Sequence, residues 1–258
     1  MYKWNPEEYK DSSKNQKSWE LELLSKIEFT GSEKVLDIGC GDGRLSAVIA
    51  DKVPNGSVTG IDLSKNMIQF AENNYSVTYK NLNFKVMNAS NINFKEQFDI
   101  IFSNAALHWI QDHKPVINGI KNSLKQSGKF YIQFGGKGNA ETVIETINKI
   151  IKSEKWGKYF IDFKFPYGFY SIEEYEKIIN NTKELQIQNI EMIQKKMKFE
   201  NKNLFSSWIR TTWLPYTKKI PETLRETFID ECVKNYTLTN NNIDNIKMVR
   251  LEVIGSKV

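Results

Sequence analysis

The chain of 258 residues has little cysteine and no long apolar segment. Its two cysteines, Cys40 and Cys232, are too few for a disulfide framework or a cysteine-rich zinc site, so we expect no metal centre. No apolar run approaches the ~20 residues of a membrane span, and residues 1–6 lack the apolar segment of a secretory signal. These absences predict a cytoplasmic protein without a membrane partner.

The chain carries only a modest excess of positive charge, with a net charge of +5 and a pI of about 8.9. A basic balance can indicate binding to nucleic acid. Here the lysines are spread along the chain, often beside acidic residues, as in Lys195, Lys196 and Glu200. This distribution favours a solvated surface, and we expect no nucleic-acid partner.

The first half of the chain alternates between short apolar segments and amphipathic ones. Connections between them are short, which predicts a parallel sheet covered by helices. Strands are predicted at 34–38, 57–61, 82–86, 98–102 and 130–134. Four helices are predicted in this half. The first spans 16–27, the second begins near Leu45, the third follows the cap residue Ser64, and the fourth has Pro115 in its first turn.

After about residue 135 the pattern changes. Helices are expected at 139–154, 172–181, 202–213 and 221–235, with a long strand at 184–199 and an aromatic stretch at 156–170. At the C-terminal end, Val249, Leu251 and Val253 alternate with Met248, Arg250 and Glu252, which is strand periodicity. Long connections often form lids. We therefore expect one domain (1–258), with a core at about 30–136, 184–199 and 246–256 and a helical cap at about 137–170 and 200–245.

The segment from Asp37 to Gly43 carries the strongest functional signal. A strand that ends in a glycine-rich turn and opens a helix is typical of nucleotide binding, because glycines allow close backbone approach and the helix start offers free N–H groups. Asp62 lies at the end of the next predicted strand, where a carboxylate can accept from both ribose hydroxyls.

Two details separate this segment from a dinucleotide site. The dinucleotide pattern G-x-G-x-x-G fails because position 44 is arginine, and the glycines stand at 39, 41 and 43. Asp37 would repel a pyrophosphate, whereas it would attract the ammonium group of a methionine moiety. The segment therefore favours S-adenosylmethionine as the cofactor.

The segment 35–43, Val-Leu-Asp-Ile-Gly-Cys-Gly-Asp-Gly, resembles motif I of the class I methyltransferases. The segment 103–113, with Leu107, His108 and Trp109, is similar to one in trans-aconitate and juvenile hormone acid methyltransferases. Residues 4–16 and 155–159 resemble further segments of that group. The resemblance implies a Rossmann-like α/β fold, with a mostly parallel seven-stranded sheet, an antiparallel final strand and a helical cap. It also implies that the N-terminal helix 16–27 closes the site.

The resemblance implies a role for each cofactor residue. Gly39, Gly41 and Asp37 would lie at the methionine end and Asp62 at the ribose. Asn88 and Ala89 would lie at the adenine, although Asn88 stands where the family usually has an acidic residue. The expected cofactor site is completed by Leu63, Met67 and Asn104.

The same resemblance points to a carboxylate as the methyl acceptor. Gln16 and Trp109 are the expected neutral donors to it, with His108 as a further donor near its ordinary pKa of about 6.5. Aromatic residues crowd both cap segments, among them Tyr167, Phe169 and Trp213, so the acid should have an apolar body. We expect a monomer acting on such a small molecule.

Other functions remain open from the sequence. The acceptor atom could be a carbon or a hydroxyl oxygen, and His108 would then be a candidate base. An RNA methyltransferase would need a contiguous basic face beside the pocket. A binding protein without catalysis would show no cofactor turnover with any acceptor.

Overall fold

The computed structural model describes residues 14–240, 243 and 245–258, and the side chains of residues 14–18 and 20 lie outside this description. Its centre is a seven-stranded sheet in the order β3-β2-β1-β4-β5-β7-β6. The strands are β1 (Lys34–Ile38), β2 (Ser57–Asp62), β3 (Leu82–Val86), β4 (Phe98–Asn104), β5 (Leu124–Gly135), β6 (Leu185–Met197) and β7 (Ile246–Lys257). Strands β1 to β5 are parallel, and β7 lies antiparallel between β5 and β6. The predicted fold class is confirmed.

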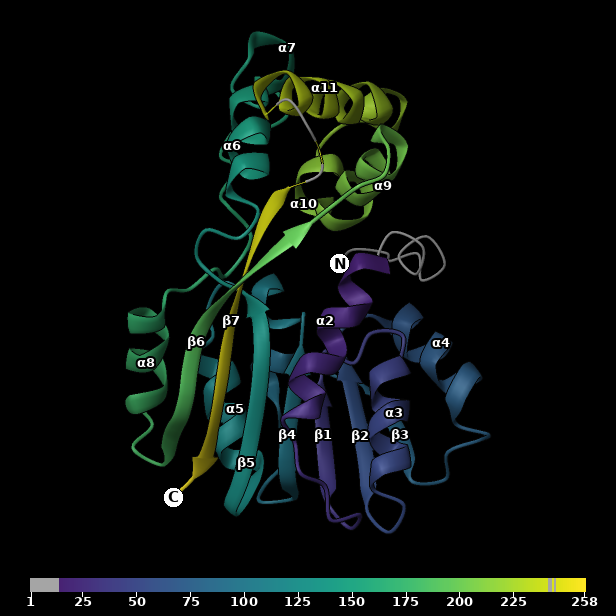
Figure 1. The fold of residues 1–258 in the computed structure, drawn as a ribbon, viewed down its shortest axis with the longest axis vertical. Coiled ribbons are helices and arrows are strands. Elements are labelled where there is room, and N and C mark those ends of the chain that lie inside the picture. The colour runs from purple at the N-terminus through teal and green to yellow at the C-terminus, as the bar shows by residue number, and fades with distance from the viewer. Residues whose placement is uncertain (1–13, 241–242, 244) are drawn as a thin grey trace.

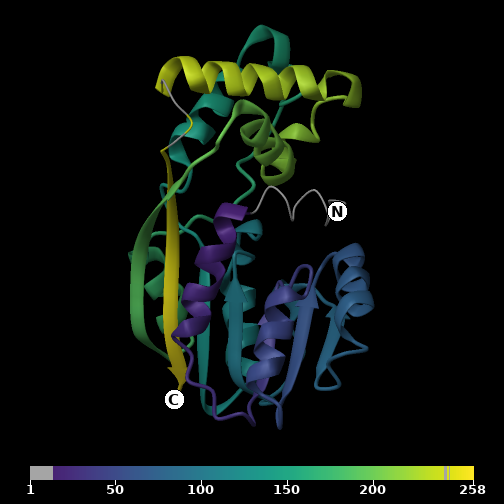
Figure 2. The same cartoon turned by 45° about the vertical axis from the view of Figure 1, so that its right-hand side comes forward.

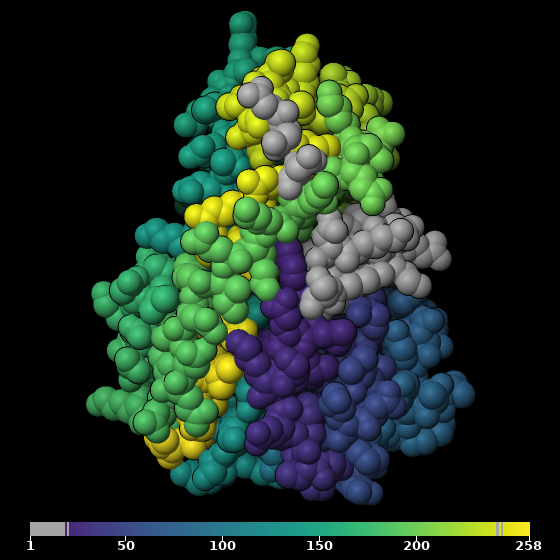
Figure 3. Space-filling view, in the orientation of Figure 1, coloured from purple at the N-terminus to yellow at the C-terminus, as the bar shows by residue number. Residues whose placement is uncertain are grey.

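Helices cover both faces of this sheet. Residues of α2 (Lys14–Ser25), α3 (Arg44–Lys52) and α4 (Lys65–Tyr75) pack on one face around Val35, Val58 and Phe102. Residues of α5 (Lys114–Ser123) and α8 (Ile172–Asn180) pack on the other face around Leu36, Ile101 and Ile132. Adjacent strand residues such as Val35 and Leu36 thus pack into hydrophobic cores on opposite faces of the sheet, because successive side chains of a strand point to opposite faces. Figure 3 shows α2 in purple between β6 and α3 on one surface of the molecule.

The remaining helices gather beyond the end of the sheet at which the parallel strands finish (Figures 1 and 2). They are α6 (Glu141–Ile150), α7 (Glu154–Gly157), α9 (Lys202–Thr212), α10 (Leu214–Thr217) and α11 (Glu222–Asn240). Their shared core is strongly aromatic and includes Trp156, Trp208 and Tyr216. We call residues 141–170 and 202–240, which contain these five helices and the segments that join them, the upper helices.

Several elements differ from the sequence prediction: α10 was not predicted, and α11 ends at Asn240, five residues after the predicted end. The predicted helix 139–154 is two helices, because the chain turns after Ile150 and Ser153 precedes the separate α7. Strand β5 begins at Leu124, six residues before the predicted start, since Leu124 already pairs with Phe98 ahead of a register shift.

Strand β7 is buried on both of its faces. Val249, Leu251 and Val253 belong to the core, and Met248, Arg250 and Glu252 on the opposite face are each at most 5% exposed. Lys26, which follows α2, pairs with the buried Glu252, and Gln133 of β5 donates to the same carboxylate at 2.9 Å. The described residues include no helix that is both long and apolar enough to cross a membrane.

Candidate functional site

The glycine turn after β1 has a left-handed backbone that favours glycine. Gly39 has φ 73° and Gly41 has φ 55°. A Cβ on Gly39 would lie 2.2 Å from Cβ of Ala106, in the loop after β4, whereas a Cβ on Gly41 would meet nothing within 4 Å. Gly39 is therefore required by packing, and Gly41 leaves open space at the end of the sheet where ligands bind in open α/β folds.

Asp62 ties this turn to the end of β2. One carboxylate oxygen accepts from the backbone N–H of Gly41 at 3.1 Å, and the other accepts from Ser64 at 2.8 Å. Each oxygen keeps a further lone pair, so the carboxylate can still accept from two hydroxyls. Burial raises the pKa of Asp62 above its ordinary value.

Asp37 lies under the turn and faces α3. Its carboxylate is 2% exposed and accepts from the hydroxyl of Ser46 at 2.5 Å. Burial raises its pKa to about 7, with a smaller contribution from the negative charges of Asp62 and Asp42. An ammonium group close to these carboxylates would favour the ionised form of Asp37.

The other expected cofactor residues lie at the ends of neighbouring strands. Leu63 is 47% exposed and Met67, in the first turn of α4, is 5% exposed. Asn88 follows β3 and caps the short turn η1 (Ala89–Asn91) by accepting from Ser90 at 2.9 Å. Asn104 is the last residue of β4.

The predicted residues therefore meet along four adjacent strand ends, those of β1 to β4. They offer an open glycine turn, a carboxylate with spare acceptor sites and a cluster of negative charge. This donor and acceptor set fits a nucleoside that carries a cationic amino-acid moiety. We therefore keep the sequence assignment of these residues as a proposal.

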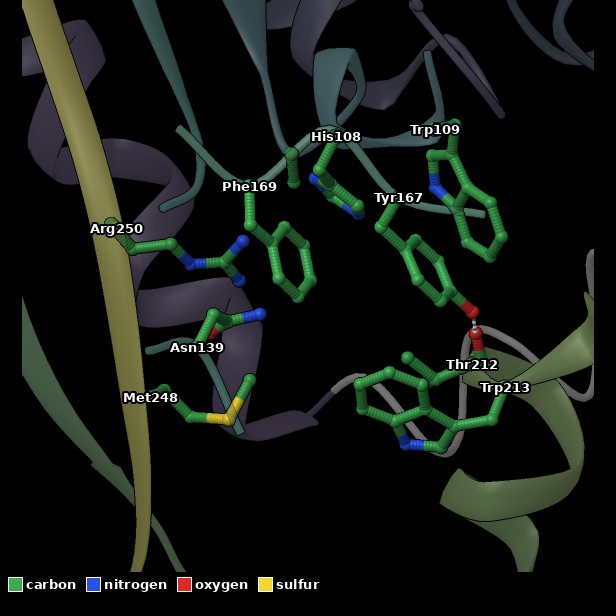
Figure 4. Close-up of a pocket in the computed structure, with 10 residues that line it drawn as sticks. His108, Trp109, Asn139, Tyr167, Phe169, Thr212, Trp213, Met248 and Arg250 are labelled. Carbon is green, nitrogen blue, oxygen red and sulfur yellow. Dashed lines mark hydrogen bonds between the residues drawn. The ribbon is translucent and has the colours of Figure 1, made fainter. Parts of the chain in front are cut away.

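Beside this group, toward β7, a pocket opens between the sheet and the upper helices (Figure 4). About 490 Å³ of space lies between its walls when open solvent is included. Its aromatic walls are close-packed, with ring centroids 5.1 Å apart for Trp109 and Tyr167 and 5.3 Å apart for Tyr167 and Trp213. The described lining residues are Ala105, His108, Trp109, Asn139, Tyr167, Phe169, Thr212, Trp213, Met248 and Arg250.

His108 lies in the turn η2 (Leu107–Trp109) at the pocket wall. Its Nδ1 accepts from the backbone N–H of Gly135 at 3.4 Å, so the proton of the neutral ring is on Nε2. Burial, together with the charge of Arg250, lowers the pKa of His108 to about 3. The sequence-based expectation of titration near 6.5 is therefore wrong, because it assumed a solvated ring.

Arg250 reaches into the pocket from β7, although only 5% of the residue is exposed (Figure 4). Its guanidinium lies 5.7 Å from the ring centroid of Trp19 on α2. Asn139 lies beside it, and its Oδ1 accepts from the N–H of Val249 at 3.0 Å. That bond leaves the amide NH2 of Asn139 on the pocket side (Figure 4).

The structure thus brings His108 and Trp109 together with residues that the sequence analysis did not select. Arg250 and Asn139 were missed, and the signal for Arg250 was a charge within a largely apolar strand. In the sheet this strand, β7, lies next to the edge strand β6. The side chain of Gln16 lies outside the described residues, as do residues 1–13, so the N-terminal part of the expected site stays a prediction.

Comparison with known proteins shows similarity to methyltransferases. A family model described as a methyltransferase domain matches residues 30–164. An uncharacterized methyltransferase of Schizosaccharomyces pombe is 31% identical over 180 residues, 68% of each chain. Trans-aconitate 2-methyltransferase of Shigella flexneri is 30% identical over 133 residues, 52% of this chain and 51% of that protein. The crystal structure of geranyl diphosphate C-methyltransferase from Streptomyces coelicolor, which contains S-adenosylhomocysteine, superposes with a TM-score of 0.58 at 14% identity, covering 94% of this chain and 81% of that one.

Proposed function

Because the chain belongs to the S-adenosylmethionine-dependent methyltransferase family and acts on a small molecule, we propose that it methylates a carboxylate oxygen of an acid with an apolar body. The proposal goes beyond family membership, which leaves the acceptor atom open. One matched relative is named for a carboxylic acid, trans-aconitate, and this likeness supports the proposal.

The charge of the pocket is the observation that carries the proposal. Among its described lining residues, Arg250 is the only one with a charged side chain, and none is acidic. The polar atoms on the pocket side are mainly donors, from Arg250, Asn139 and the Nε2–H of His108. A buried guanidinium disfavours a cationic amine and matches the two oxygens of a carboxylate. An anionic acceptor therefore suits this pocket best.

The residues of the chain can support the reaction without a base. When bound, the cofactor supplies an electrophilic methyl group. A carboxylic acid with a pKa near ~4 is already ionised at neutral pH, so no side chain needs to remove a proton. Arg250 and Asn139 would hold the carboxylate, and Trp109 and His108 would orient it. A carboxylate has about four acceptor sites, so at most three of these donor groups can bind it at one time if one lone pair is kept for attack.

The apolar walls define the rest of the acceptor. Tyr167, Phe169 and Trp213 come from the upper helices, and Met248 comes from β7. We propose that the upper helices are the cap of a single methyltransferase domain and that they exclude water from the reacting groups. Each methylene of the acceptor buried there would add about 0.8 kcal/mol to binding.

A library screen tests the proposed acceptor. The protein is incubated with S-adenosylmethionine and a series of carboxylic acids, amines, phenols and alcohols, and the products are identified by mass spectrometry. We expect methyl esters of acids with an apolar body and increasing kcat/KM with chain length. Methylation of amines or phenols with no ester would refute the carboxylate assignment, and a flat series would refute the apolar pocket.

The variant Arg250→Met tests whether the positive charge in the pocket binds the acid. Charge-assisted hydrogen bonds contribute about 1.5–3 kcal/mol, so kcat/KM for the acid should fall by about 10- to 150-fold. The matched control is Arg210→Met, which removes a guanidinium that pairs with Glu226 outside the pocket. Affinity for S-adenosylmethionine should stay within about threefold in both variants, since Arg250 is on β7 and the cofactor residues are on β1 to β4.

A further inference from the structure

A buried histidine beneath the pocket has no part in the function proposed above. His113 precedes α5 and is inaccessible to solvent. Its backbone explains its position, because its carbonyl accepts from Ile117 in the first turn of the helix. Its ring packs 4.9 Å from Phe134 and 4.7 Å from Tyr170, measured between centroids. A leucine would fill the same space, so packing alone does not explain an imidazole here.

Both ring nitrogens of His113 have partners. Nε2 lies 2.8 Å from the carbonyl oxygen of Leu107 and 3.0 Å from that of Ile110. Nδ1 lies 3.2 Å from the hydroxyl oxygen of Tyr175 on α8. Because carbonyl oxygens only accept, the ring proton is on Nε2, and Nδ1 accepts from Tyr175. Burial lowers the pKa of His113 to about 4, so the ring is neutral at physiological pH.

The two carbonyls belong to the first residue of the turn η2 and to the residue that follows it. Between them stand His108 and Trp109, which line the acceptor pocket. The carbonyl of Leu107 already accepts from the N–H of Ile110 at 2.9 Å, but it keeps a second lone pair, and the carbonyl of Ile110 also needs a partner. We propose that His113 is a positioning residue: its Nε2–H bridges the two ends of this turn and so holds His108 and Trp109 toward the acceptor.

The bridge also fixes the adjoining aromatic wall. Gly168 packs directly on it, since a Cβ at this position would lie 2.1 Å from the oxygen of Ile110 and 3.0 Å from Nε2 of His113. The N–H of Gly168 donates to the carbonyl of His108 at 3.0 Å. Tyr167 and Phe169, which flank Gly168, therefore depend on the same turn. His113 would position both walls of the pocket without touching the acceptor.

The inference rests on the proposed acceptor pocket, and a pair of variants tests it. Glutamine carries an NH2 group near the place of Nε2 and can donate to both carbonyls, whereas leucine cannot. With the acid that gives most ester in the screen above, His113→Leu should lower kcat/KM by about tenfold or more. His113→Gln should restore it to within about threefold of the wild type, and the Kd for S-adenosylmethionine should stay within about threefold in both. His113→Leu within about twofold of the wild type, or no recovery with glutamine, would overturn the proposal.

A second measurement uses the wild-type protein and needs no acceptor. In nitrogen-15 NMR of the histidine rings of the wild-type protein, His113 should show a protonated Nε2 and an unprotonated Nδ1 from about pH 6 to 8. A proton on Nδ1 would overturn the bridge directly. If the screen yields no ester, the NMR result still tests the bridge made by His113, so the two proposals fail separately.

Discussion

The absence of a catalytic base can be tested by the pH dependence of kcat. With a pKa of about 3, the ring of His108 is protonated in only about one molecule in 3,000 at pH 6.5. Arg250 does not titrate in the working range, and an acceptor acid with a pKa near ~4 is fully ionised. At saturating cofactor and acceptor, kcat should therefore change by less than about twofold between pH 5.5 and 7.5. A base with a pKa of 6.5 would instead give about a tenfold rise over this range.

The variant His108→Asn separates the donor role from a base. The Oδ1 of asparagine can still accept from Gly135, but the variant lacks the Nε2–H donor. We expect the same flat profile with kcat/KM lower by about 0.5–1.5 kcal/mol, or about 2- to 13-fold. The chain has only one other histidine, His113, whose pKa of about 4 keeps it from titrating in this range. A rise through a pKa near ~7 that disappears in His108→Asn would make His108 a base and would refute the carboxylate assignment.

Three further predictions concern the cofactor side. Asp62→Ala should weaken S-adenosylmethionine binding by about tenfold or more in calorimetry, and an affinity within about twofold of the wild type would remove Asp62 from the site. Gly39→Ala should lower the unfolding temperature more than Gly41→Ala, because only its Cβ meets Ala106, while Gly41→Ala should mainly weaken cofactor binding; equal loss of stability would contradict this. The raised pKa of Asp37, about 7, means that its contribution to the stability of the cofactor-free protein is present near pH 4 and is lost as the pH rises to about 7. Asp37→Asn should therefore remove part of the fall in stability between pH 5 and 8, and an unchanged pH dependence in thermal unfolding would show that Asp37 titrates normally.

The fold could be predicted from the sequence because the patterns that indicate it lie within short segments of the chain. Strand and helix periodicity and the glycine turn at 39–43 each occupy a few consecutive residues, and the structure has the corresponding elements there. The acceptor pocket depends instead on segments far apart in the chain. Asn139 acquires its orientation from Val249, 110 residues away, and Arg250 packs against Trp19 of α2, which is far from it in the chain. A pattern of alternating residues cannot show that both faces of a strand are covered.

His108 illustrates the same limit for chemistry. Its place next to Trp109 was visible in the sequence. Its lowered pKa depends first on burial in the fold and then on the charge of Arg250, more than 100 residues further along the chain. The bridging role proposed for His113 likewise requires Tyr175 and the turn carbonyls to come together in the fold.

The burial of Arg250 also bears on turnover. Under the proposed reaction the acid enters with a negative charge opposite the guanidinium and becomes a neutral ester. The ester therefore lacks the ionic attraction to Arg250 that the acid has. The ester should therefore bind more weakly than the acid and be a weak product inhibitor. Arg250 would therefore favour binding of the substrate over binding of the product.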